Sequence, residues 1–155
     1  MEWKDRYALG IEAMDATHRE FVDLVGALST VADDAAISRL EALIAHSEAH
    51  FEQENRWMKE SGFPPIHCHV GEHRRVIASL KSVLFLARRG NPGLARIVAR
   101  EMATWFENHV ATMDAALAAH LRPWFRERQT FPGSGKAQES QEAGAFARGP
   151  RRAGA

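Results

Sequence analysis

The chain has 155 residues, of which 45% are hydrophobic, so we expect one domain with a substantial apolar core. Lysine and arginine together number 20, as do aspartate and glutamate, and the formal net charge is zero. This balance gives no electrostatic reason to expect a nucleic acid or an anionic membrane as a partner.

Residues 1–14 are predicted to form an arm rather than part of a helix, because Gly10 disfavours a continuous helix there. The apolar side chains of the arm are Trp3, Tyr7, Leu9 and Ile11. These side chains need an apolar partner, so we expect the arm to pack across a helical bundle.

The first two helices are predicted at residues 15–31 and 36–61. Asp15 is the expected N-cap of the first, since its carboxylate can accept from a backbone N–H two or three residues on, and Asp33-Asp34 is expected to end it. Gly62 and the Pro64-Pro65 pair stop the second. The inward stripes are Met14, His18, Phe21, Val22, Val25 and Leu28, then Leu40, Leu43, Ile44, His50, Phe51, Glu54, Trp57 and Met58.

The third helix is predicted to begin near residues 67–69 and to end by Gly90, and the fourth begins near Leu94 after the turn signal Gly90-Asn91-Pro92-Gly93. The third stripe is His69, His73, Val76, Ile77, Leu80, Leu84 and Ala87. The fourth is Ile97, Val98, Met102, Trp105, Phe106, His109 and Val110. Helical spacing in all four segments predicts that each buries one face.

An irregular turn is expected at residues 110–116. His109 and Asp114 are five residues apart, which separates them by about 140° on a regular helix. Both can reach one centre only if the helix widens, tightens or breaks there. A short segment carrying Leu117, Leu121, Trp124 and Phe125 then closes the bundle, with Pro123 interrupting it.

From about Glu127 the composition changes to Gly, Ala, Ser, Gln, Pro and Arg, which cannot bury enough apolar surface to offset the entropy of ordering. We therefore expect a bundle domain over residues 1–126 and a disordered polar tail over residues 127–155. No strand pattern competes with the helices. The predicted fold class is all-α, an up-down-up-down four-helix bundle with an N-terminal arm.

Seven side chains on the inward faces could bind metal: His18, His50, Glu54, His69, His73, His109 and Asp114. The pairs 50/54 and 69/73 are spaced i, i+4, which places both members on one helical face. A lone buried histidine is usually a hydrogen-bonded core residue. Leaving this many buried polar groups unpaired would cost about 1–3 kcal/mol each. A metal centre removes that cost, because it coordinates the lone pairs.

Two iron ions are the cofactor that these ligands favour. Seven ligands are too many for one tetrahedral zinc and suit two octahedral ions that share the carboxylates. Imidazole with carboxylate fits iron, and no thiolate set is present for an iron–sulfur cluster. Cys68 is not an expected ligand, because its neighbour His69 points about 100° away on a helix.

The ligands follow the order Asp15-x-x-His18, His50-x-x-x-Glu54, His69-x-x-x-His73 and Trp105-x-x-x-His109-x-x-x-x-Asp114. Trp3 and Gly10-Ile11 lie upstream. This pattern resembles the hemerythrin family in its single-domain bacterial form, over roughly residues 1–125. The resemblance implies a hemerythrin-like bundle with a non-haem di-iron centre that binds O2.

The resemblance also implies a role for each ligand. His69, His73 and His109 would hold one iron, and His18 and His50 the other. Glu54, Asp114 and an oxo or hydroxo group would bridge them. O2 would bind reversibly at the iron with two histidines, which keeps an open position. An oxygen carrier or store is therefore expected, and no enzyme.

Two other functions stay open on the sequence. One is an oxygen or redox sensor acting through a signalling or redox protein partner, although sensors usually append an output domain and this chain has only a short tail. The other is a di-iron enzyme that reduces nitric oxide or peroxide, or repairs iron centres. The chain has no Glu-x-x-His motif, which disfavours oxygenase chemistry but not these reactions.

A bound O2 needs a dry site, and we expect Phe21, Val22, Trp105 and Val110 to line it. Plain core packing explains any single one of them equally well. The other three histidines are not expected ligands. His46 lies one turn before His50 and could support that ligand, although a surface or core polar role is favoured. His67 could compete with His69, but only His69 pairs with His73 at i, i+4, and His120 is predicted to be exposed.

A cytoplasmic location is expected. No apolar run approaches the roughly 20 residues that span a bilayer, and residues 1–5 show no apolar signal region. Cys68 is the only cysteine, which excludes an intramolecular disulfide and fits a reducing compartment.

Overall fold

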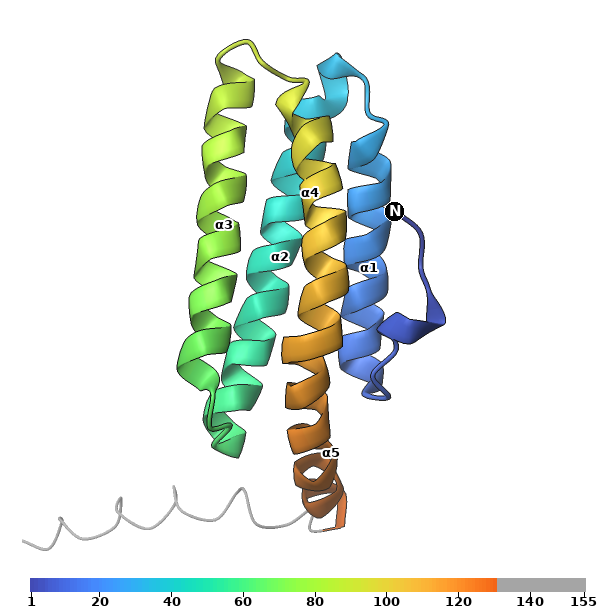
Figure 1. Ribbon diagram of the computed structural model, residues 1–155, viewed down its shortest axis with the longest axis vertical. Coiled ribbons are helices and arrows are strands. Elements are labelled where there is room, and N and C mark those ends of the chain that lie inside the picture. Colours follow the sequence, from blue (N-terminus) through green and yellow to red (C-terminus); the bar gives the residue numbers. More distant parts are fainter. Residues whose placement is uncertain (131–155) are drawn as a thin grey trace, which may run out of the picture.

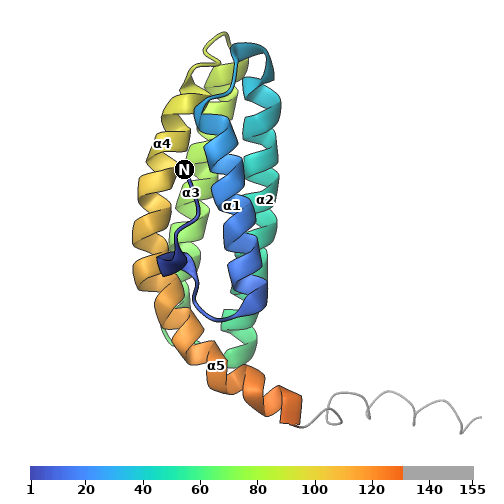
Figure 2. The ribbon, with the colours of Figure 1, turned by 90° about the vertical axis from the view of Figure 1, so that its right-hand side faces the viewer.

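The computed structural model describes residues 1–130, and all of the regular secondary structure over them is helical. Its four long helices are α1 (Glu12–Ser29), α2 (Asp33–Ser61), α3 (Ile66–Arg88) and α4 (Leu94–His109). Short connections make successive helices antiparallel, and Figures 1 and 2 show them side by side. The predicted up-down-up-down four-helix bundle is confirmed. Within residues 1–130, no helix is long and apolar enough to cross a bilayer.

The N-terminal arm packs across α1 and α4, as expected (Figure 2). A 3-10 turn at Asp5–Tyr7 buries the Tyr7 ring edge-on against Phe106, with ring centroids 5.3 Å apart. The Tyr7 hydroxyl donates to Glu107 Oε1 at 2.6 Å. Earlier in the arm, the Met1 carbonyl lies so close to Gly26 that a Cβ there would stand 2.6 Å from its oxygen. Both ends of the arm are therefore held against the bundle.

Asp15 does not cap α1, because the helix begins before it, at Glu12. Its carboxylate instead accepts from the backbone N–H groups of Leu9, at 2.7 Å, and Gly10, at 3.0 Å. Gly10 has a φ of 75°, the left-handed conformation that turns the chain at this point. Asp15 therefore fastens the arm to α1. The Asp33-Asp34 pair likewise does not end α1 but begins α2, where its charge suits the positive end of the helix dipole.

The inward faces of the helices form two apolar clusters, a large one among α1 to α4 and a smaller one around Trp57, Met58, Leu117 and Leu121. The prediction that Ile97 lies on the inner face of the fourth helix is wrong, because this residue is 48% exposed. The inward face of α4 runs instead through Ala95, Val98, Ala99 and Met102. Their spacing matches one stripe of a helix, and Ile97 lies about 100° from Val98 on the same turn.

The irregular turn predicted after His109 is a π-helical turn at Val110–Asp114. It leads into α5 (Ala115–Thr130), which Figure 2 shows curving away from the axis of α4. The prediction that Pro123 interrupts this segment is wrong, because α5 continues through Pro123. Proline removes one N–H donor there, while Leu121 is buried before it and Phe125 meets Trp57 after it, with ring centroids 5.7 Å apart.

The helix α5 ends at Thr130, so residues 127–130, which the composition assigned to the tail, are helical. The rest of that predicted tail, residues 131–155, lies outside the described residues.

Candidate metal centre

Seven buried polar side chains from every helix of the bundle face one another in its interior. They are His18 from α1, His50 and Glu54 from α2, His69 and His73 from α3, His109 from α4, and Asp114 from the π-helical turn. None is more than 5% exposed. These are the seven residues that the sequence pattern singled out, and the fold brings all of them together.

Three imidazoles form the first group of donors. Nε2 of His109 lies 3.1 Å from Nε2 of His69 and 3.2 Å from Nε2 of His73. Nitrogens held about 2.1 Å from one ion at right angles would lie about 3.0 Å apart. Nε2 of His109 therefore has, to each of the other two nitrogens, the spacing of neighbouring ligands of an octahedral ion.

A second group consists of His18 and His50 with Glu54. Nε2 of His50 is 3.0 Å from Oε1 of Glu54, one helical turn further on. Nε2 of His18 is 3.7 Å from the same oxygen. The His18 and His50 rings are 5.1 Å apart, so α1 and α2 present their histidines to a shared point.

Each carboxylate faces both groups, one oxygen to each. Oε1 of Glu54 faces His18 and His50, whereas Oε2 lies 3.4 Å from Nε2 of His73. Oδ1 of Asp114 is 3.1 Å from the Nε2 atoms of His69 and His109. Its Oδ2 is 3.4 Å from Nε2 of His18. A carboxylate with one oxygen toward each of two donor groups has the arrangement of a bridging ligand.

The two carboxylates are charged and set the protonation of the site. Burial lowers the pKa of His18, but the nearby carboxylates of Asp114 and Glu54, which favour the protonated ring, outweigh burial and raise it to about 9. Burial raises the pKa of Glu54, while the cluster histidines, His50 first, hold it well below its usual range. Burial and the charge on Glu54 raise the pKa of Asp114, yet the close approach of His109, His18 and His69 brings it below its ordinary value.

The seven side chains fit metal ions because several of their polar atoms find no hydrogen-bond partner within the cluster. Both ring nitrogens of His18, Oε2 of Glu54 and both carboxylate oxygens of Asp114 are buried without a hydrogen-bond partner among the described residues. Orphaned buried groups of this kind cost about 1–3 kcal/mol each. Burial also lowers the pKa of His73, which favours the neutral imidazole that a metal requires.

Aromatic rings surround the donors. Phe51 stacks on His73 at 4.0 Å, and Trp105 stacks on His109 at 4.4 Å. The Phe106 ring meets His18 edge-on at 5.3 Å and is itself stacked against Phe21 at 4.9 Å.

Of the four predicted pocket residues, Phe21, Val22 and Val110 are at most 1% exposed, in the same apolar cluster as Phe106. Trp105 is partly exposed. Their lining of an O2 pocket stays a prediction.

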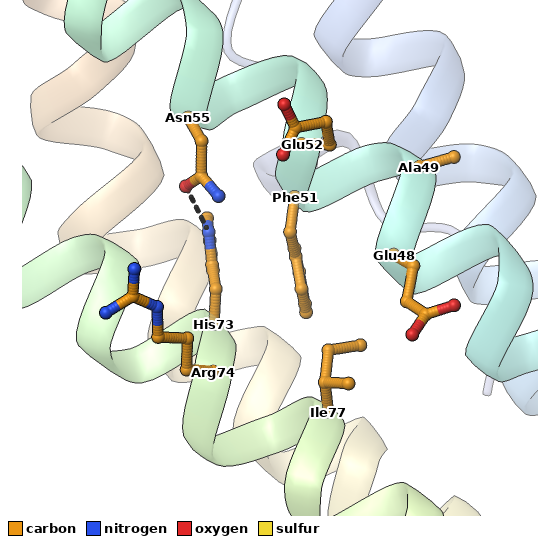
Figure 3. Close-up of a pocket in the computed structure, with 8 residues that line it drawn as sticks. All are labelled: Glu48, Ala49, Phe51, Glu52, Asn55, His73, Arg74 and Ile77. Carbon is orange, nitrogen blue, oxygen red and sulfur yellow. Dashed lines mark hydrogen bonds between the residues drawn. The ribbon is translucent and has the colours of Figure 1, made fainter.

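Two polar residues outside the predicted set are hydrogen-bonded to side chains of the site: Asn55 to His73, and Glu72 to Trp105. Asn55 accepts from Nδ1 of His73 through its Oδ1, at 3.1 Å. Figure 3 shows this pair at the edge of a hollow of about 480 Å³ between α2 and α3. Glu72 accepts from the Trp105 indole N–H at 2.8 Å. Neither has a signal in the sequence beyond its place next to a ligand, because polar residues at such positions are commonly solvated.

The remaining histidines lie outside the cluster. Nε2 of His46 is 3.2 Å from the Thr17 carbonyl, and its Nδ1 is 3.5 Å from Glu20. His67 is exposed, as is Cys68. The predicted exposure of His120 is wrong, since this ring is partly buried with Nε2 3.1 Å from the Ser61 carbonyl.

Comparison with known proteins agrees with this geometry. Residues 9–121 match the family model of the hemerythrin HHE cation binding domain. The chain is 38% identical over 121 residues to a bacteriohemerythrin of Ralstonia nicotianae (strain ATCC BAA-1114 / GMI1000), covering 78% of this chain and 88% of that protein. It is 25% identical over 136 residues to a bacteriohemerythrin of Stenotrophomonas maltophilia (strain R551-3), covering 83% and 88%. All seven clustered side chains lie inside the matched range.

Proposed function

The chain belongs to the hemerythrin family, and on that premise we propose that it binds O2 reversibly at a pair of non-haem irons, as a carrier or store. One observation carries the proposal: two groups of buried donors share carboxylates that face both of them. A single-ion site would not need this sharing. Imidazole and carboxylate are ligands that suit iron.

The proposed ligands follow the two donor groups. His69, His73 and His109 would hold one iron, supported by the 3.1 and 3.2 Å spacings of their Nε2 atoms. His18 and His50 would hold the other. Glu54 and Asp114 would bridge the two ions, together with a solvent-derived oxo or hydroxo group.

The unequal number of histidines creates the place where O2 would bind. With three bridging oxygens, three histidines complete six-coordination at one ion, and two histidines leave the other one ligand short. That open position would lie on the side of His18 and His50. Two ferrous ions would supply there the electrons that reversible O2 binding requires.

The chain itself supplies a buried site with aromatic side chains on one side of it. Phe21 and Phe106 stack beside His18, and both are at most 1% exposed. Exclusion of water protects a bound ligand from side reactions. Five imidazole ligands also bring less negative charge than a carboxylate-rich set, which favours reversible binding over oxygenation of a substrate.

The test follows the visible spectrum of the iron-loaded protein. The protein is reduced without oxygen, exposed to air and then deoxygenated through several cycles, with zinc-loaded protein as the control. An absorption band that appears with O2 and disappears on its removal supports the proposal. Irreversible oxidation within one cycle contradicts it. Sustained consumption of added peroxide or nitric oxide would point to a di-iron enzyme instead.

A further inference from the structure

We propose that Asn55 is a positioning residue of the metal centre, which holds the imidazole of His73 so that its Nε2 faces the ions. The inference rests on the proposed iron function and extends it to a residue outside the seven donors. Within the described residues, His73 is the one member of the seven-residue cluster to which Asn55 is hydrogen-bonded. Its effect would therefore pass through His73.

The contact fixes which ring nitrogen carries the proton. Nδ1 of His73 donates to Oδ1 of Asn55 at 3.1 Å (Figure 3). On the opposite edge of the ring, Nε2 lies 3.2 Å from Nε2 of His109 and 3.4 Å from Oε2 of Glu54. A neutral imidazole carries a proton on only one of its two ring nitrogens. Placing it on Nδ1 leaves the lone pair on Nε2, the atom that faces the centre.

A second residue of α2 fixes the plane of the same ring. The Phe51 ring lies 4.0 Å from that of His73, with only 4° between the two planes. Phe51 and Asn55 are spaced i, i+4, so α2 presents both on one face toward α3. The stack prevents the imidazole from tilting, and the hydrogen bond prevents it from turning within its plane. Together they leave one orientation for Nε2.

His73 has a hydrogen-bond partner at Nδ1, whereas three of the other cluster histidines do not. Nδ1 of His18, His50 and His69 is buried without a hydrogen-bond partner in the described part of the chain. An amide oxygen accepts the hydrogen bond without carrying a net charge. It therefore orients the ring and leaves it a neutral ligand. Groups of this kind around a metal typically change its affinity 10- to 100-fold when they are removed.

The surrounding hollow explains why such an anchor is needed. Asn55 and His73 line it together with exposed charged residues, so solvent can approach the outer edge of the ring. Water would compete for the Nδ1 proton if no side chain held it. Of the two acids in the hollow, Glu48 is paired with Lys81 at 2.6 Å. Among the described residues, Nδ1 of His73 has its hydrogen bond with Asn55 and none with Glu52.

The experiment compares Asn55→Leu, Asn55→Asp and the control Glu52→Gln in the full chain. Ferrous affinity is measured by competition with a chelator, and the reduction potential of the iron-loaded protein by titration. Asn55→Leu should weaken ferrous affinity about 10- to 100-fold. Asn55→Asp keeps an acceptor and should restore affinity, while its charge shifts the potential to a more negative value. Glu52→Gln should change neither.

Two results would overturn the inference. One is wild-type affinity and potential in Asn55→Leu; the other is an equal loss in the Leu and Asp variants, which would show a packing role only. If the wild type binds no iron, the proposed function fails separately. Nitrogen resonances of the His73 ring in the iron-free chain then decide the inference: a proton on Nδ1 in the wild type and its redistribution in Asn55→Leu support it, and an unchanged tautomer refutes it.

Discussion

Oδ1 of Asp114 lies 3.1 Å from Nε2 of His109, although a regular helix would point the two side chains about 140° apart. The π-helical turn Val110–Asp114 closes this angle by adding one residue to the turn. A local irregularity of the backbone thus places a carboxylate between the donor groups. Turns of this kind are frequent at functional sites, because they re-aim a side chain without ending the helix.

Replacing that carboxylate tests whether both ions depend on it. Asp114→Asn has the same shape but loses the charge that the three neighbouring histidines stabilise. We expect fewer than two irons per chain and at least a tenfold weaker ferrous affinity, by analogy with other groups that tune metal sites. Iron analysis of purified protein measures this, with exposed Asp23→Asn as the control. Two tightly bound irons in Asp114→Asn would refute its bridging role.

Removing one histidine of the three-nitrogen group should release iron and weaken the fold. His73→Ala takes away a donor and the partner of the Phe51 stack. A tenfold loss of metal affinity corresponds to about 1.4 kcal/mol of stability supplied by bound metal. Thermal unfolding of iron-loaded protein should therefore shift to lower temperature. His67→Ala, exposed on the same helix, should leave iron content unchanged, and full occupancy in His73→Ala would contradict the assignment.

The apolar wall beside His18 should control how long the oxygenated protein lasts. Phe21→Ala removes a fully buried ring that stacks on Phe106, at a cost of about 3–5 kcal/mol. Water then gains access to the site, so oxidation of the oxygenated protein should accelerate several-fold. Leu28→Ala is the control, because it is equally buried at the far end of α1. Equal oxidation rates in both variants would assign Phe21 to packing alone.

The N-terminal arm should detach when Glu107 loses its charge. Lys4 and Arg6 pair with this carboxylate at 2.6 and 2.9 Å, and Tyr7 donates to it. Glu107→Gln should therefore speed tryptic cleavage after Lys4 and Arg6 several-fold at neutral pH. Exposed Glu101→Gln should not change the rate. Unchanged cleavage in Glu107→Gln would show that the arm is held by its apolar contacts alone.

The same contact predicts a pH dependence for the arm. The hydrogen bond from Lys4, then that from Tyr7, lowers the pKa of Glu107 from 4.5 to about 2. A lowered carboxylate pKa stabilises the folded arm above pH 4.5, and this contribution disappears as the pH falls toward 2. Ring resonances of Tyr7 should therefore stay constant down to about pH 4.5 and change below it. A midpoint at 4.5 would show that Glu107 is not stabilised.

Deleting residues 131–155 should leave the metal centre intact. The seven side chains of the proposed centre and the two apolar clusters around them are formed by residues within 1–130, the part of the chain that the structure describes. Iron content, visible spectrum and thermal unfolding should equal those of the full chain. A lost visible band in the shortened chain would show that this segment supports the site.

The sequence alone determined the helical bundle and which seven polar side chains meet in its interior. Both are recorded in short-range spacing: a stripe repeats with the helical period, and the pairs 50/54 and 69/73 sit one turn apart. Even the π-helical turn followed from local geometry, because His109 and Asp114 could share a centre only if the helix deviated between them. The ligand order then pointed to the family, which the comparison confirms.

Only the tertiary structure decided which partners the other polar groups find. Asp15 looked like a helix cap but binds the backbone of Leu9 and Gly10, because the arm folds back over α1. Asn55 was not singled out in the sequence, yet it accepts from His73, because α2 packs against α3. Contacts between helices depend on how their faces meet, and spacing within one helix carries no record of that.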